Sequence, residues 1–85
     1  MKIELKLFGA FRTLSSEGLI DFDLPENATA DDLRYAVEIL ADAEGQTRLV
    51  DLLPSCRFST ETDILGKTAA LTSGKYAILP PVSGG

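Results

Sequence analysis

The 85-residue sequence contains no histidine and no tryptophan, and its only cysteine is Cys56. Without a second cysteine, no disulfide can form within the chain and no pair of thiolates can bind a metal. The absence of histidine excludes most zinc sites and the acid–base catalysis that imidazole performs near neutral pH. We therefore expect no metal site and no bound cofactor in this chain.

Positive charge and long apolar runs are also scarce. Thirteen acidic residues outnumber eight basic ones, which leaves a net charge of −5. An acidic chain is a poor ligand for nucleic acid or for an anionic membrane surface, and it favours a basic protein partner. No apolar run approaches the length of a membrane span, and residues 1–4 do not resemble the apolar core of a signal peptide. We expect a cytoplasmic protein.

Hydrophobic residues nevertheless make up 45% of the chain, which is enough to build the core of one small domain. Residues 2–7 alternate polar and apolar side chains, which predicts a strand with one buried face. Residues 19–24 alternate in the same way, and the short connection predicts an antiparallel hairpin. Continuing the first alternation places Phe8 on the outward face, where either a loop or a partner protein would cover it.

One main helix is predicted to follow Thr29. Thr29 is a suitable N-cap, and the two aspartates after it suit the positive end of the helix dipole. Gly45 is a suitable residue to end the helix at its C-terminus. The carboxylates along this helix are interpreted as a solvated face rather than as catalytic groups. Apolar residues recur at helical spacing and define the expected buried face: Leu33, Ala36, Val37 and Leu40.

The second half of the chain is predicted to contain shorter elements. These are a helical turn at 49–53 that ends at Pro54, a strand at 55–60, a brief arm at 64–65 and a last strand at 75–79. Cys56 is expected within a strand as a small structural side chain, because Arg57 is the only nearby cation that would favour a reactive thiolate. In the last strand, alternation places Tyr76 and Ile78 inward and Leu79 outward.

The chain ends in Pro80-Pro81-Val82-Ser83-Gly84-Gly85. Two adjacent prolines have a fixed φ and no N–H to give to a sheet, so they form an extended spacer. Glycine has no Cβ, so a Gly-Gly end is thin enough to enter a narrow channel. Fully extended, six residues reach roughly 20 Å, far enough to bring a terminal carboxylate into another protein. We therefore divide the chain into a domain at 1–79 and an extended tail at 80–85.

The string Leu79-Pro80-Pro81-Val82-Ser83-Gly84-Gly85 resembles the C-terminal signature of the small subunit of molybdopterin synthase, the MoaD family of ubiquitin-like sulfur carriers. The predicted order of elements is similar to the ubiquitin-like β-grasp fold, an α+β fold with one main helix packed across a mixed sheet. In that fold the first and last strands are parallel central neighbours. Phe8 and Leu79 would then lie side by side as an apolar docking surface.

The resemblance implies a sulfur-carrying subunit with no catalytic residues of its own. It implies that a ubiquitin-activating-type adenylyltransferase uses ATP to adenylate Gly85, and that sulfur from a donor enzyme converts the adenylate to a thiocarboxylate. The sulfur would pass, in the large subunit of molybdopterin synthase, to cyclic pyranopterin monophosphate for molybdenum cofactor biosynthesis. Gly84 would be the thin neck. The implied partner-binding residues are Phe8, Ile64, Leu79, Pro80, Pro81, Val82 and Ser83.

The residues themselves support a partner as the source of the activation chemistry, because the chain has no phosphate-binding loop of the GxxxxGK[ST] kind. Three other hypotheses stay open: a sulfur carrier for thiamine or amino-acid synthesis, a modifier joined to lysines through Gly85, and a β-grasp interaction module with an incidental tail. The Pro-Pro-Val-Ser segment before the terminal glycines favours the molybdopterin pathway over the other sulfur pathways. The sequence departs from the family at Glu61, where an Asn is frequent, and at Gly74-Lys75, where a Gly-Asp pair is frequent.

Overall fold

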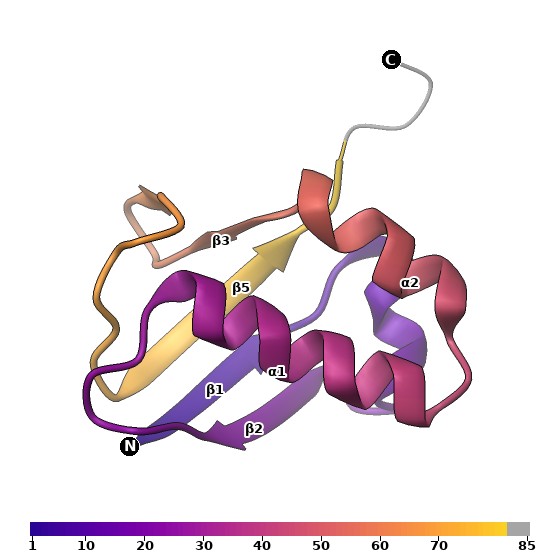
Figure 1. Cartoon of the computed structure of the whole chain (residues 1–85), viewed down its shortest axis with the longest axis horizontal. Coiled ribbons are helices and arrows are strands. Elements are labelled where there is room, and N and C mark those ends of the chain that lie inside the picture. The colour runs from indigo at the N-terminus through magenta and orange to yellow at the C-terminus, as the bar shows by residue number, and fades with distance from the viewer. Residues whose placement is uncertain (82–85) are drawn as a thin grey trace.

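The computed structural model describes residues 1–81, which form a five-stranded mixed sheet with α1 packed across one face (Figure 1). The strand order is β2-β1-β5-β3-β4. The strands are β1 Lys2–Lys6, β2 Leu19–Asp23, β3 Arg57–Ser59, β4 Ile64–Leu65 and β5 Gly74–Leu79. The helices are α1 Ala30–Ala43 and α2 Thr47–Leu52, with the 3₁₀ helices η1 Gly9–Leu14 and η2 Leu53–Ser55. This arrangement is the predicted β-grasp fold.

The centre of the sheet is a parallel pair formed by the two ends of the domain. β1 pairs antiparallel with β2 and parallel with β5, so Lys6 lies opposite both Leu19 and Ala77. The predicted hairpin and the predicted parallel pairing of the first and last strands are both confirmed. β3 then pairs antiparallel with β5 and with β4.

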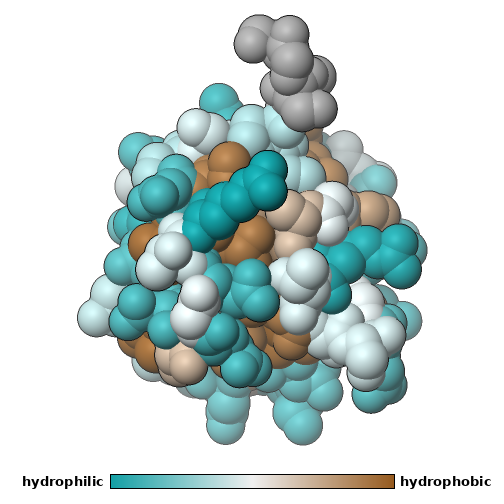
Figure 2. Space-filling view, turned by 90° about the vertical axis from the view of Figure 1, so that its right-hand side faces the viewer, coloured by the Kyte–Doolittle hydropathy of each residue, from teal (hydrophilic) through white to brown (hydrophobic). Residues whose placement is uncertain are grey.

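Period-2 alternation produces the core as expected. Ile3, Leu5 and Leu7 are buried under α1, together with Tyr76 and Ile78 from β5. Along β1 and β5, these buried residues alternate with more exposed ones. On the side of the molecule shown in Figure 2, hydrophilic residues lie between the hydrophobic ones at the surface. Within residues 1–81, no helix combines the length and the apolar character needed to cross a membrane.

α1 begins and ends where the local sequence predicts. The Thr29 hydroxyl accepts a hydrogen bond from the Asp32 backbone N–H, and the Asp32 carboxylate accepts one from the Thr29 N–H at 2.8 Å. This reciprocal capping box satisfies two donors that the first turn leaves without helical partners. Gly45 has φ +71°, a left-handed conformation that ends the helix at little steric cost.

The buried side of α1 differs in part from the prediction. Leu33 and Val37 are fully buried as expected, but Ala36 and Leu40 are only half-buried. The remaining buried positions are Ala30 and Ala41, at the two ends of the helix. Each of these alanines contacts a connecting segment through its backbone, because Ala30 N–H donates to the Ala69 carbonyl at 3.0 Å and the Ala41 carbonyl accepts from Gln46 N–H at 2.8 Å. Sequence periodicity alone does not reveal such contacts.

Three further expectations are corrected. The short connection after the first strand, for which no helix was predicted, contains η1, where Phe11 is fully buried and donates its N–H to the Phe8 carbonyl at 3.2 Å. Cys56, predicted within a strand, lies between η2 and β3. Pro54 lies inside η2 instead of stopping the preceding turn, because a proline near the start of a helix loses no hydrogen bond.

Candidate functional site

The candidate site is the face of the sheet that points away from α1, here called the outer face. Strand pairing arranges its side chains in a row across the sheet. Lys6 lies between Leu19 and Ala77, and Ser59 lies between Ala77 and Ile64. Side chains on a strand alternate between the two faces, so this row lies opposite the buried Leu5 and Ile78.

Large apolar side chains remain exposed on the outer face. Phe8 is 38% exposed, Leu19 is 41% exposed and Ile64 is 65% exposed. The Lys6 ammonium lies 5.4 Å from the centroid of the Phe8 ring, which is within the range of a cation–π interaction. No loop of residues 1–81 covers Phe8 completely, so this side chain is accessible from outside the domain.

Leu19 is an outer-face residue that the sequence reading did not single out. The predicted alternation of residues 19–24 contained the signal, because the half-buried Ile20 and Phe22 lie on the inner face and Leu19 must then point outward. Ile64 and Phe8, which were singled out separately, lie on the same face as Leu19 but toward opposite edges of the sheet. The structure thus brings the apolar side chains from β2, β1 and β4 onto one face.

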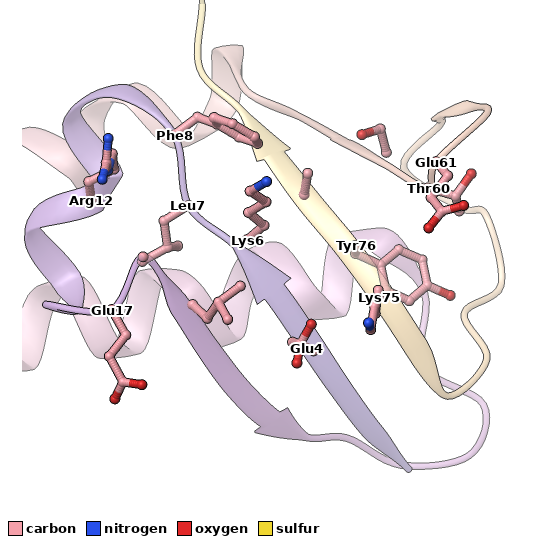
Figure 3. A pocket seen from close by; sticks show the side chains of 14 residues that line it. Glu4, Lys6, Leu7, Phe8, Arg12, Glu17, Thr60, Glu61, Lys75 and Tyr76 are labelled. Atoms are coloured by element: carbon pink, nitrogen blue, oxygen red, sulfur yellow. The ribbon is translucent and has the colours of Figure 1, made fainter.

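A shallow hollow of about 610 Å³ crosses the outer face (Figure 3). Its charged side chains have balanced signs. The bases are Lys6, Arg12 and Lys75, and the acids are Glu4, Glu17 and Glu61. A site for a phosphate group would carry an excess of positive charge, so this mixed lining suits the surface of a protein partner better than a small anion. In the described residues 1–81, no three acidic or cysteine side chains gather as metal ligands would.

The tail leaves the domain beside the outer face. Leu79 ends β5 opposite Arg57, and Leu79, Pro80 and Pro81 are all half-buried. Extending the β1–β5 register by two residues places Phe8 beside Leu79. Val82, Ser83, Gly84 and Gly85, which were predicted as tail site residues, lie outside the described residues.

One close contact is found at the root of the tail. Gly9 has φ +58°, and a Cβ placed on it would lie 3.0 Å from Pro80 Cγ. The backbone after β1 therefore approaches the first tail residue more closely than a side chain would permit. The predicted neighbours Phe8 and Leu79 directly precede Gly9 and Pro80, so this contact supports their adjacency.

Cys56 lies outside this site, and its surroundings do not activate it. Its thiol is half-buried and donates to the Leu52 carbonyl oxygen at 3.3 Å. Burial raises the pKa of the Cys56 thiol to about 11. A thiol that stays protonated at neutral pH is a poor nucleophile, so these features favour the structural role that was expected for this residue.

No protein-family model matches the sequence. A curated relative, the molybdopterin synthase sulfur carrier subunit of Synechococcus elongatus, is 36% identical over 88 aligned positions, which cover 98% of this chain and 96% of that protein.

Solved structures share the fold. A putative molybdopterin converting factor, subunit 1, from Pyrococcus furiosus has a TM-score of 0.73 at 20% identity, covering 96% of this chain and 99% of its own. Small archaeal modifier protein 1 from Haloferax volcanii has a TM-score of 0.69 at 22% identity, covering 95% of this chain and 98% of its own.

The structural similarities establish the ubiquitin-like β-grasp fold, since identities this low carry no functional conclusion by themselves. The similarity to the Synechococcus protein is higher and extends over nearly the full length of both chains. This chain therefore belongs to the family of molybdopterin synthase sulfur carrier subunits.

Proposed function

We propose that this chain is the sulfur carrier subunit of a molybdopterin synthase and that it carries sulfur as a thiocarboxylate on Gly85. The observation that carries this proposal is the 36% identity, over nearly the whole chain, to a protein of that name. The position of the tail supports it, because Pro80 and Pro81 follow directly from the central strand β5. A packed strand gives the tail a defined starting point and direction.

The proposed loading has two steps, both on a partner. A Gly85 carboxylate oxygen attacks the α-phosphorus of ATP on an adenylyltransferase and releases pyrophosphate. A sulfide equivalent from a sulfur donor then attacks the resulting acyl-adenylate and releases AMP, which leaves a thiocarboxylate. This chain contributes the carboxylate, the narrow Gly84 neck and the proline spacer, and the partner contributes the catalytic groups.

The outer face is the proposed docking surface for the adenylyltransferase and, after loading, for the large subunit of molybdopterin synthase. Phe8, which follows the inner strand β1, and Leu19, on the neighbouring edge strand β2, offer two apolar anchors, and the balanced charges around them offer polar contacts. Leu79 and Pro80 connect this surface to the tail. A partner that binds the outer face therefore receives the tail from a fixed point.

The test is an intact-mass measurement on the purified protein after incubation with ATP, a sulfur donor and the organism's own adenylyltransferase. We expect the mass gain of one oxygen replaced by sulfur, mapped to Gly85, and no gain without ATP. A variant that lacks Gly84 and Gly85 is the matched control. Unchanged mass, with an adenylyltransferase that loads another carrier, would refute the proposal.

The acceptor requires a second assay, because a thiocarboxylate also serves sulfur carriers of other pathways. The loaded protein is mixed with the large subunit and cyclic pyranopterin monophosphate, and the formation of molybdopterin is followed. We expect conversion by the loaded protein and none by the unloaded one. Loading without conversion would assign this chain to another sulfur pathway, such as thiamine or amino-acid synthesis.

A further inference from the structure

α1 carries a second exposed apolar feature, on the side that points away from the sheet. Tyr35 is 58% exposed and Ile39 is 54% exposed, and their spacing of four residues places them together on one helix face. We call this pair the helix patch. Five large hydrophobic side chains are exposed within residues 1–81, and the other three, Phe8, Leu19 and Ile64, lie on the outer face.

The fold does not require apolar residues at the helix patch. Leu33 and Val37, which are fully buried, lie on the side of α1 that faces the core. The opposite side of such an amphipathic helix is ordinarily polar. Single exposed hydrophobic residues are common on protein surfaces, but neighbouring ones on a surface helix indicate a contact surface. Neither Tyr35 nor Ile39 belongs to the hydrophobic core cluster of residues 1–81 or to the partly buried residues packed against it.

Charge around the helix patch indicates what kind of molecule covers it. Residues 30–44 contain five acidic residues, Asp31, Asp32, Glu38, Asp42 and Glu44, and one basic residue, Arg34. Arg34 already bonds within the helix, with Nε donating to Asp31 at 2.8 Å and Nη1 donating to Glu38 at 3.4 Å. A partner with an apolar socket surrounded by lysine and arginine would match this surface.

The same charges argue against three other occupants. A second copy of this chain would bring identical carboxylates together across a symmetric contact, and like charges in an interface are unfavourable. An anionic membrane surface or a nucleic acid would be repelled for the same reason. A basic protein is the occupant that the described residues favour.

The helix patch and the outer face lie on opposite sides of the sheet. Figure 1 shows α1 in front of the sheet, and Figure 3 shows the outer face with the helices behind it. A protein bound at Tyr35 and Ile39 therefore leaves Phe8 and Leu19 free for another partner. The two surfaces permit a three-protein complex around one carrier.

We propose that the helix patch docks a basic sulfur-donating protein while the outer face is occupied by the adenylyltransferase. This inference rests on the proposed function. An acyl-adenylate is a mixed anhydride that water hydrolyses, so it survives only while the adenylyltransferase shields it. The donor must therefore reach the carrier inside that complex, when the outer face is already occupied. The helix patch is the apolar surface of the described residues that is still accessible at that moment.

The test measures binding of the purified donor to the carrier in the presence of saturating adenylyltransferase. The double variant Tyr35→Gln/Ile39→Gln is compared with the wild type by calorimetry. Both side chains are more than half exposed, so the melting temperature should change little. Losing two apolar anchors should weaken donor binding by about tenfold or more. Asp42→Asn should weaken it less and should reduce its dependence on salt.

Phe8→Ala is the matched control, because it changes the other surface. It should weaken adenylyltransferase binding and leave donor binding to the free carrier unchanged. If the double variant does not fold, Ile39→Gln alone gives the same comparison.

Three results would overturn the proposal: equal donor affinity of the double variant and the wild type, competition between donor and adenylyltransferase for the carrier, or a donor that does not bind the wild type. A second assay distinguishes failure of the helix-patch proposal from failure of the proposed function. It measures ATP–pyrophosphate exchange with the carrier and the adenylyltransferase, without the donor. Normal exchange with unchanged donor binding refutes only the helix patch. Exchange that is absent with the wild-type chain refutes the carrier function itself.

Discussion

Replacing Gly9 with alanine tests whether the tail is aimed by its contact with the end of β1. Gly9 has φ +58°, and an alanine in this left-handed conformation costs about 1–2 kcal/mol. The new Cβ would also lie 3.0 Å from Pro80 Cγ, whereas carbon atoms prefer about 3.5–4.0 Å. Pro80 must therefore shift by roughly half an ångström or more, and the tail shifts with it.

Two separable effects are expected from Gly9→Ala. The backbone strain should lower the melting temperature by about 4–8 °C for each kcal/mol lost in a domain of this size. The displaced Pro80 should lower kcat/KM for thiocarboxylate loading by about tenfold, since a misplacement of about 1 Å can cost about 100-fold. Loading is measured by intact mass at a temperature well below both melting transitions.

Gly45→Ala is the matched control. Gly45 has φ +71°, so alanine there suffers the same kind of backbone strain, but its added Cβ meets no atom within 4 Å. We expect both variants to lose similar stability and only Gly9→Ala to load slowly. If the two variants load at the same rate, the Gly9–Pro80 contact does not aim the tail. If Gly9→Ala is as stable as the wild type, this result would contradict a left-handed backbone conformation at Gly9.

Three further changes give separate tests. Phe8→Ala should weaken adenylyltransferase binding by about 2 kcal/mol with little change in melting temperature, and a large loss of stability would instead make Phe8 a core residue. Gly84→Ala should slow loading and sulfur transfer while the circular dichroism spectrum stays unchanged, and normal transfer would refute the narrow-channel requirement. The pKa of Cys56 is raised from 9.0 to about 11, so the fold favours the protonated thiol. Wild-type stability should therefore fall relative to Cys56→Ala as the pH rises between these values, and a parallel pH dependence of the two proteins would contradict the burial of this thiol.

Much of the fold could be predicted from the sequence because its determinants are local. Period-2 alternation in residues 2–7 identified β1 and its buried face, since successive side chains on a strand point to opposite sides. Thr29 and Gly45 identified the ends of α1 through hydrogen bonding and φ, which involve only neighbouring residues. The Pro-Pro-Val-Ser-Gly-Gly ending led to the family, which the comparison with the Synechococcus protein then confirmed.

Other features depend on contacts between segments that are distant in the sequence. Phe11 enters the core from a connection that looks like a loop, because η1 turns its side chain under the sheet. The sequence alone did not indicate that Ala30 and Ala41 would be buried at the expense of Ala36 and Leu40, because that choice depends on how α1 crosses the sheet.

The site shows the same division. Alternation within single strands predicted that Phe8 and Leu79 point outward, whereas only the register of β1, β5 and β2 placed Leu19 and Ala77 in the same row as Lys6. The contact between Gly9 and Pro80 joins residues 71 positions apart, and no local pattern records it. The sequence by itself determined the main elements β1, β2, α1 and β5, both ends of α1 and the family tail, whereas η1 and the extent of β3 were not predicted. Only the tertiary structure decided which side chains share a face, because strand register and helix packing are set by the whole core.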